Sequence, residues 1–269
     1  MGPEHNKRPL PIDLFLIRHG QSEGNIAIAK SRTGDDSDYS DEFRRRHSGT
    51  WKLTDYGCWQ AERAGRWLRR NSFERFNRYS VSPYHRALQT AALLKLPDAN
   101  WYIEPYLRER EWGHLDTLPD SEKVARFAEA MARQDAEGFY WAPPNGESFA
   151  QASMRIDSVI ESHSREHSDG TAAIVCHEDV MRIFRVRIEH ISEHDFKKAM
   201  DDEPIHNCQI LHYTRRDDTG DIHPFMMRRR SICPWDESLT DSTWKQIVRK
   251  SFSNAELLSI VNPPARKAA

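Results

Sequence analysis

A short apolar run ends in a cluster of anion-binding groups in the stretch Leu14-Phe15-Leu16-Ile17-Arg18-His19-Gly20-Gln21-Ser22-Glu23-Gly24-Asn25. Uninterrupted apolar runs of this length are typical of strands covered on both faces, as in a parallel sheet flanked by helices. The carboxyl end of such a strand opens at a crevice. Here it carries a guanidinium (Arg18), an imidazole (His19) and a glycine (Gly20) that lets the backbone bend close to a ligand. The polar residues that follow can begin a helix whose free N–H groups face an anion, so the stretch predicts a phosphate-binding pocket.

The order Arg18-His19-Gly20-x-Ser22-x-x-Asn25 after a hydrophobic strand resembles the signature of the histidine phosphatase superfamily, the phosphoglycerate mutase-like branch in particular. The resemblance covers roughly Leu14 to Val180, with long unmatched stretches inside it. It implies an α/β fold, a three-layer sandwich with a mostly parallel central sheet flanked by helices, plus a helical cap-like insertion. It also implies that Ser22 and Asn25 contribute to phosphate binding.

Length and composition favour a single domain over residues 1–269. Within it we expect a loose N-terminal lead-in (1–11), a cap-like insertion (114–147) and a peripheral C-terminal extension (234–269). The formal net charge is −2 at pH 7, so no overall field indicates nucleic acid or a membrane surface as a partner. The oligomeric state stays open.

The four cysteines are scattered without Cys-x-x-Cys spacing, at Cys58, Cys176, Cys208 and Cys233. The sequence shows no N-terminal apolar signal region and no long hydrophobic span. We therefore expect a soluble protein of a reducing compartment, the cytoplasm.

A second motif supplies another cation for the phosphate. Ser82-Pro83 predicts the start of a helix over residues 84–96, which places Arg86 in the first turn beside free backbone N–H groups. A guanidinium and helix N–H groups together suit a phosphate. The pattern Ser82-Pro83-x-x-Arg86-Ala87-x-Gln89-Thr90-Ala91 resembles the second motif of the superfamily, which implies phosphate binding by Arg86.

A second buried strand over residues 171–176 ends in His177. Taken alone, this ring could be a core imidazole bonded to backbone, but beside the first motif we favour a phosphate donor. The family usually shows His-Gly here, whereas this chain has His177-Glu178, a departure that changes the local charge and the backbone freedom near the pocket.

Two carboxylates and two guanidiniums alternate in Tyr106-Leu107-Arg108-Glu109-Arg110-Glu111-Trp112-Gly113. Residue types alone describe a solvated salt-bridge ladder. The resemblance to the Leu-x-Glu-Arg-x-x-Gly block of phosphoglycerate mutases implies that Glu109 is the proton donor. Arg110 lies behind it as a phosphate ligand, and Glu111 is the local competitor.

Residues 31–50 are rich in Asp, Ser, Gly and Arg and lack aliphatic side chains, which predicts a long loop. Its end, Ser48-Gly49-x-Trp51, resembles a substrate-facing loop of the superfamily. This implies that Ser48 and the Gly49 N–H contact the phosphate. The basic residues just before them, 44–47, either touch the rest of the substrate or face solvent.

In the last third of the chain, residues 207–213 and 222–229 are predicted to form an edge hairpin, with Arg228, Arg229 and Arg230 facing solvent. Residues 238–248 and 254–261 are predicted to be helices packed on the outside. The histidine pairs His163/His167 and His190/His194 have helical spacing but lack the Glu of His-Glu-x-x-His, so we interpret them as surface residues and predict no metal site.

These residues together suit phosphoryl transfer without a cofactor. Neutral His19 would attack phosphorus, and Glu109 would protonate the leaving alcohol and then activate water. The catalytic set is His19, Glu109, His177, Arg18 and Arg86, and the phosphate-binding set is Arg18, Ser22, Asn25, Ser48, Gly49, Arg86, Arg110 and His177.

The sequence favours a phosphomonoester hydrolase over a mutase, because the segment after Gly113 lacks the lysine of the mutase pattern. A phosphoglycerate mutase-type transferase and a catalytically silent phosphate-binding module are the alternatives. The substrate class stays open between a small phosphate ester and a phosphoprotein, and the basic residues of the 31–50 segment suggest additional negative charge on it.

Overall fold

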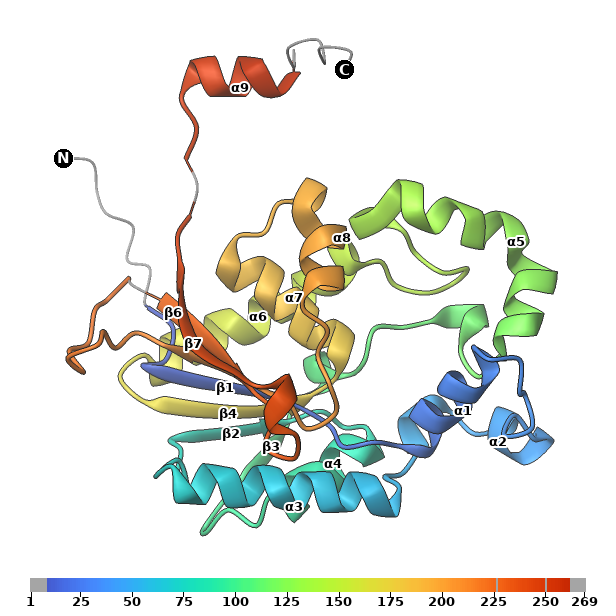
Figure 1. Cartoon of the computed structure of the whole chain (residues 1–269), viewed down its shortest axis with the longest axis horizontal. Helices are drawn as coiled ribbons and strands as arrows, with labels where there is room; N and C mark the ends of the chain where they lie inside the picture. Colours follow the sequence, from blue (N-terminus) through green and yellow to red (C-terminus); the bar gives the residue numbers. More distant parts are fainter. Residues whose placement is uncertain (1–8, 226, 250, 262–269) are drawn as a thin grey trace.

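The computed structural model describes residues 9–225, 227–249 and 251–261. Within them, a seven-stranded sheet has the order β3-β2-β4-β1-β5-β6-β7 (Figure 1). The strands are β1 Asp13–Arg18, β2 Arg78–Val81, β3 Trp101–Ile103, β4 Thr171–Cys176, β5 Ile210–Thr214, β6 Met227–Ile232 and β7 Asp241–Ile247. The α-helices are α1 Glu23–Ser31, α2 Asp41–Arg45, α3 Asp55–Arg70, α4 His85–Leu93, α5 Asp120–Glu137, α6 Phe149–His167, α7 Glu178–Glu189, α8 Glu193–Asp202 and α9 Asn254–Val261.

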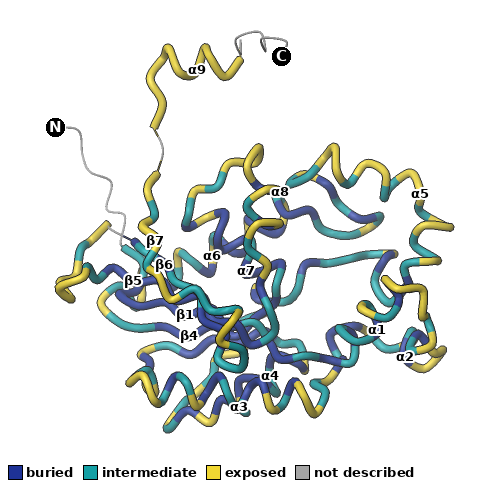
Figure 2. Tube along the Cα trace, viewed as in Figure 1, coloured by how far each residue is buried: buried dark blue, intermediate teal, exposed yellow. Residues whose placement is uncertain are grey.

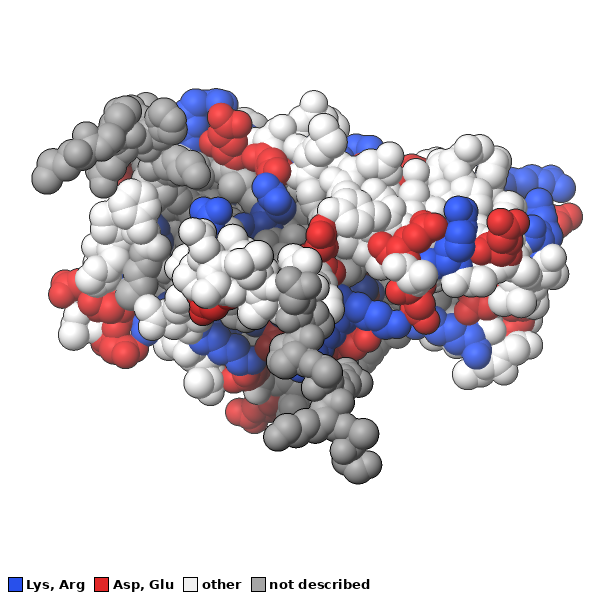
Figure 3. Space-filling model, turned by 90° about the horizontal axis from the view of Figure 1, so that it is seen from above, with Lys and Arg blue, Asp and Glu red and all other residues white. Residues whose placement is uncertain are grey.

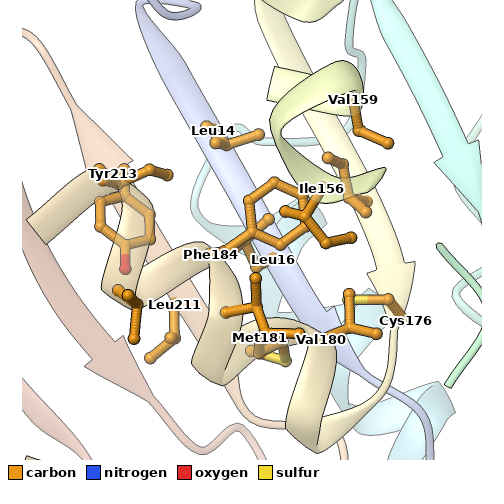
Figure 4. Close-up of a cluster of buried hydrophobic side chains, with 14 of the residues drawn as sticks. Leu14, Leu16, Ile156, Val159, Cys176, Val180, Met181, Phe184, Leu211 and Tyr213 are labelled. Carbon is orange, nitrogen blue, oxygen red and sulfur yellow. The ribbon is translucent and has the colours of Figure 1, made fainter. Parts of the chain in front are cut away.

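The central strand β1 is covered on both faces, as its apolar run predicted. Leu14 and Leu16 pack in one cluster with residues of α6 and α7, drawn in Figure 4. Phe15 and Ile17 pack in a second cluster with α3 and α4. Figure 2 shows the central strands β1 and β4 buried between these helices. Because successive side chains of a strand point to opposite faces, the run fills two cores at once, and the predicted α/β sandwich is confirmed.

The sheet is mixed, with a parallel half that carries the candidate site. β1 pairs with β4, β4 with β2, and β2 with β3, all parallel. β5, β6 and β7 extend the other side of β1 through antiparallel pairs. In the β1–β4 register Arg18 lies opposite Cys176, so the residues that follow the two strands emerge next to each other at one edge.

The predicted cap-like insertion holds helix α5, which matches the helix expected there and contacts α1. In Figure 1, α1, α2 and α5 lie together beyond one end of the sheet. The Asp120 N–H donates to Ser31 Oγ at 2.7 Å, which ties the insertion to the end of α1.

The 31–50 segment is more ordered than the predicted long loop. It contains α2 and a 3-10 turn at Ser48–Thr50. Its small core is aromatic, because Tyr39 and Phe43 are buried with Trp51, and the Phe43 and Trp51 rings stack at 4.7 Å. The segment was predicted to be a loop because it lacks aliphatic residues, but its aromatic side chains form the small core instead.

Helices α3 and α6 begin directly after a capping side chain, whereas α4 begins and ends at other residues than predicted. Thr54 caps α3, and Ser148 forms a capping box with Gln151 at the start of α6. Helix α4 begins at His85, one residue later than predicted, and ends at Leu93, three residues earlier.

The C-terminal prediction is wrong in three respects, which concern β7, Arg229 and the packing of α9. The segment predicted as a helix over 238–248 is largely strand β7, so β6 is not the edge of the sheet. Arg229 is buried rather than facing solvent, because its guanidinium pairs with Glu189 (2.9 Å) and Glu203 (2.6 Å). Helix α9 forms as predicted, but its residues are exposed and it projects away from the sheet in Figure 1. Most of the predicted lead-in (1–8) and the last residues of the extension (262–269) lie outside the described residues.

In the described part of the chain, no helix has the length and apolar character needed to cross a bilayer.

Candidate active site

His19 and His177 meet where the two central parallel strands end. His19 follows β1, His177 follows β4, and the His19 N–H donates to the Cys176 carbonyl at 3.0 Å. Both side chains are buried, with ring centroids 5.1 Å apart and an angle of 60° between the ring planes. The strand register therefore delivers two imidazoles to one point, as the two motifs predicted.

The tautomer of His19 follows from its hydrogen bonds. Its Nδ1 lies 2.7 Å from the Gly20 carbonyl oxygen, which can only accept, so Nδ1 carries the proton. Its Nε2 accepts from Arg86 Nε at 3.1 Å. Burial, followed by the charges of Arg86 and Arg18, holds the pKa of His19 well below its usual value. The ring is therefore neutral at pH 7, with its lone pair on Nε2.

His177 has the same kind of constraint from a serine. Ser82 Oγ lies 2.7 Å from His177 Nε2 and accepts the Tyr84 N–H at 3.3 Å. When Ser82 donates its hydroxyl proton to Nε2, the His177 proton is on Nδ1. That atom is buried and makes no hydrogen bond to any described residue, although Glu109 Oε2 lies 3.9 Å away. Burial and the charge of Arg86 lower the pKa of His177 well below its usual value.

Two guanidiniums reach the same point. Arg86, in the first turn of α4, is buried and donates through Nη1 to the Ser48 carbonyl at 2.8 Å. Arg18 donates through Nη1 to the Ile205 carbonyl and lies 2.8 Å from Glu178 Oε2. Its Nε is buried and has no hydrogen-bond partner among the described residues. Arg18 Nε and His177 Nδ1 are thus two buried donors suited to the oxygens of an anion.

Glu109 lies beside His177, with its Oε2 3.9 Å from Nδ1 of that ring. Its Oε1 accepts the Arg110 N–H at 3.0 Å. Burial, followed by the negative charge of Asp179, raises the pKa of Glu109 to about 7. A carboxyl group that titrates near neutral pH can both give and take a proton, which is what a general acid and base requires.

Arg110 is buried but is engaged away from the two histidines. Its Nε donates to Asp179 at 2.8 Å and its Nη1 donates to the Glu147 carbonyl at 3.0 Å. The guanidinium also packs against the rings of Trp112 and Phe149 at 4.3 and 4.4 Å. These contacts hold the Glu109 segment against α7, and none of them is with Arg18, His19, Arg86 or His177.

Ser22 and Asn25 form the capping box of α1. Ser22 Oγ accepts the Asn25 N–H, and Asn25 Oδ1 accepts the Ser22 N–H at 3.0 Å. The Gly49 N–H, which was predicted to contact the phosphate, donates to His47 Nδ1 at 3.0 Å in this structure. Ser48 meets the site through its carbonyl, which orients Arg86.

Three residues that position the histidines have roles that the sequence did not indicate. Ser82, expected only as a helix cap, bonds to His177. Thr90 Oγ1 accepts the Gly20 N–H at 3.0 Å, and Asn207 Nδ2 donates to the His19 carbonyl at 3.0 Å. Thr90 lies four residues after Arg86 in the same motif, and this position is the sequence feature from which its role could have been predicted. Asn207 is far from both motifs in the sequence, and no sequence feature predicted its role.

In the residues that the structure describes, no group of three His, Cys, Asp or Glu side chains is arranged to hold a metal ion. His163, interpreted from the sequence as a surface residue, is buried in α6, with Nδ1 2.9 Å from the Val159 carbonyl and Nε2 3.3 Å from Ser80 Oγ. A cavity of about 440 Å³ beside β6 and β7 is lined by neither His19 nor His177, but by residues such as Arg185, Glu203 and Arg229.

Two known proteins have sequences similar to this chain. The 6-phosphofructo-2-kinase/fructose-2,6-bisphosphatase of Gallus gallus is 25% identical over 177 residues, which are 66% of this chain and 33% of that protein. A 2,3-bisphosphoglycerate-dependent phosphoglycerate mutase of Methylobacterium radiotolerans is 31% identical over 150 residues, 53% of this chain and 62% of the mutase. The match thus spans about a third of the first relative and less than two thirds of the second.

Among solved structures, the alpha-ribazole phosphatase from Shigella flexneri superposes with a TM-score of 0.59 at 19% identity, covering 79% of this chain and 96% of that one. At this identity the likeness shows the fold. The sequence profile of the histidine phosphatase superfamily (branch 1) matches residues 14–225, which are most of the chain and include both histidines. The protein belongs to the histidine phosphatase superfamily.

Proposed function

We propose that this protein is a phosphomonoester hydrolase that acts through a phosphohistidine on His19. The observation that carries the proposal is the arrangement of a neutral His19, its Nε2 lone pair facing Arg86, beside a second imidazole at 5.1 Å. Of the three similar proteins described above, two have names that include a phosphatase activity and one is named a mutase, which supports phosphoryl transfer.

In the first step, the phosphate oxygens accept hydrogen bonds from Arg18, Arg86 and His177. Once an oxygen accepts the Arg86 N–H, the Nε2 lone pair of His19 is released to attack phosphorus. The N–P bond forms as the bond from phosphorus to the leaving oxygen breaks, and protonated Glu109 gives its proton to that oxygen.

In the second step, the Glu109 carboxylate takes a proton from water. The water oxygen attacks phosphorus, the N–P bond breaks, and inorganic phosphate leaves with His19 neutral again. The positive charge that this scheme needs comes from the guanidiniums, so we propose that no metal takes part. Activity is expected to persist after treatment with EDTA, and its loss would contradict this part of the proposal.

The test is to trap the intermediate. Wild type mixed rapidly with ³²P-labelled substrate and quenched in alkali should hold one acid-labile, alkali-stable phosphoryl group, and His19→Ala should hold none. Inorganic phosphate should form at the same time. If phosphate esters bind without forming an adduct or releasing phosphate, the protein is a phosphate-binding module instead.

A phosphoglycerate mutase is the second candidate, because the Methylobacterium relative with 31% identity carries that name. Incubation with 3-phosphoglycerate and a bisphosphoglycerate primer distinguishes the two. Formation of 2-phosphoglycerate faster than inorganic phosphate would favour the mutase, whereas release of phosphate alone would favour the hydrolase.

A further inference from the structure

Glu178 places a carboxylate directly on one of the proposed phosphate ligands. It is the first residue of α7, next to His177, and its Oε2 lies 2.8 Å from Arg18 Nη1. The same Nη1 donates to the Ile205 carbonyl, so both hydrogens of this nitrogen are used within the chain. The Arg18 side chain is 13% exposed and that of Glu178 26% exposed, which places this pair partly open to solvent.

The position of Glu178 is held from its other side. Its Oε1 accepts from Arg182 Nη2, one helical turn later, at 2.6 Å. Arg182 also lies 3.6 Å from Asp179, which pairs with Arg110 at 2.8 Å. The carboxylate of Glu178 is therefore braced against Arg18 by a chain of ion pairs, and it remains beside the phosphate position when Nε of Arg18 binds an oxygen.

Two basic residues of the 31–50 segment, Arg44 and Arg46, are already paired with carboxylates of this chain. Arg46 forms two hydrogen bonds with Glu23, at 2.8 and 3.1 Å, and Arg44 pairs with Glu122 at 2.8 Å. On the face drawn in Figure 3, basic and acidic side chains are interspersed and do not form a basic patch. The contacts of Arg44 and Arg46 therefore do not support the expectation that these two residues meet extra negative charge on the substrate.

We infer that Glu178 is a specificity-determining residue that disfavours substrates whose leaving group carries a second negative charge. The inference rests on the proposed function and narrows its substrate class to phosphomonoesters of neutral or cationic alcohols. A second carboxylate or phosphate near Arg18 meets the fixed charge of Glu178, and a neutral hydroxyl or an ammonium group does not. The two charges interact appreciably because the site is partly shielded from water.

The experiment compares two ligands that share a phosphoryl group and differ in one charge, glycerol 3-phosphate and 3-phosphoglycerate. Their dissociation constants are measured by calorimetry on His19→Ala, which cannot consume them, and on the double variant with Glu178→Gln. The control is Glu129→Gln in the same background. Glu129 is exposed on α5 and forms no ion pair with another described residue, so this variant makes the same change in net charge elsewhere.

We expect His19→Ala to bind glycerol 3-phosphate more tightly than 3-phosphoglycerate. Glu178→Gln should shift the ratio of the two dissociation constants about tenfold toward 3-phosphoglycerate, equivalent to about 1.4 kcal/mol, and Glu129→Gln should leave the ratio within about twofold of its starting value. Because both ligands carry the same phosphoryl group, a general change in phosphate affinity cancels in the ratio.

The inference is overturned if Glu178→Gln leaves the ratio unchanged, if Glu129→Gln shifts it equally, or if neither ligand binds. Hydrolysis of p-nitrophenyl phosphate by wild type tests the proposed function separately. An active enzyme with an unchanged ratio would refute the role of Glu178 alone, whereas a protein that forms no phosphohistidine would refute the proposed function.

Discussion

Replacing Glu109 with glutamine should make the protein more stable above neutral pH. In the folded chain the pKa of Glu109 is raised from 4.5 to about 7, first by burial and then by Asp179. Because the folded state holds this proton more tightly than the unfolded chain, wild type loses stability as pH rises from 4.5 through 7. A difference of roughly 2.5 units at about 1.36 kcal/mol each corresponds to about 3 kcal/mol. The glutamine carries no charge, so it avoids this penalty and still accepts the Arg110 N–H.

The assay is urea unfolding of wild type and Glu109→Gln at several pH values. The variant should gain up to about 3 kcal/mol over wild type at pH 8 and less than about 1 kcal/mol at pH 5. Glu129→Gln, on the exposed surface of α5, should show no such pH-dependent gain. A difference between wild type and Glu109→Gln that is the same at pH 5 and pH 8 would refute the reasoning, since the Glu109 carboxyl group would then have an ordinary pKa.

Three further outcomes are expected. Glu109→Gln should lower kcat/KM by about 10²-fold or more for an alkyl phosphate. The loss should be far smaller for p-nitrophenyl phosphate, whose leaving group departs without a proton. For the alkyl phosphate, kcat/KM of wild type should decline above pH 7, where Glu109 ionises, while kcat/KM of the variant should not change with pH in this range. Ser82→Ala removes the hydroxyl that holds His177 Nε2, so kcat/KM should fall about tenfold and the ring ¹⁵N shifts of His177 should show a changed tautomer; unchanged shifts would contradict the assignment. Gly20→Ala would place its Cβ 2.4 Å from the backbone oxygen of Gly57, in the first turn of α3. Urea unfolding should therefore show a loss of about 1–3 kcal/mol, and full stability would show that the Gly20 segment and α3 can move apart.

Local sequence patterns were sufficient for β1 and β4, the two parallel strands that end at the histidines. The run Leu14–Ile17 is apolar at every position, and a strand covered on both faces is the structure that buries all four side chains. Thr54 and Ser148 are of the residue types typical of helix starts, and each caps its helix because a side-chain oxygen satisfies a free N–H group of the first turn. The segment over 238–248 was predicted wrongly, since a short, weakly amphipathic stretch becomes strand β7 only because β6 offers it an edge.

The sequence by itself determined which chemical groups are available: two histidines that end apolar strands, two arginines beside them and a carboxyl group nearby. Only the tertiary structure decided what each of them does. The β1–β4 register brings the rings of His19 and His177 within 5.1 Å, and burial keeps both neutral. Asn207, at the His19 carbonyl, and Glu178, on Arg18, acquire their roles from pairings across the fold. The physical reason is that residue type and spacing describe local chemistry, whereas proton positions and pKa values depend on burial and on charges that distant parts of the chain bring together.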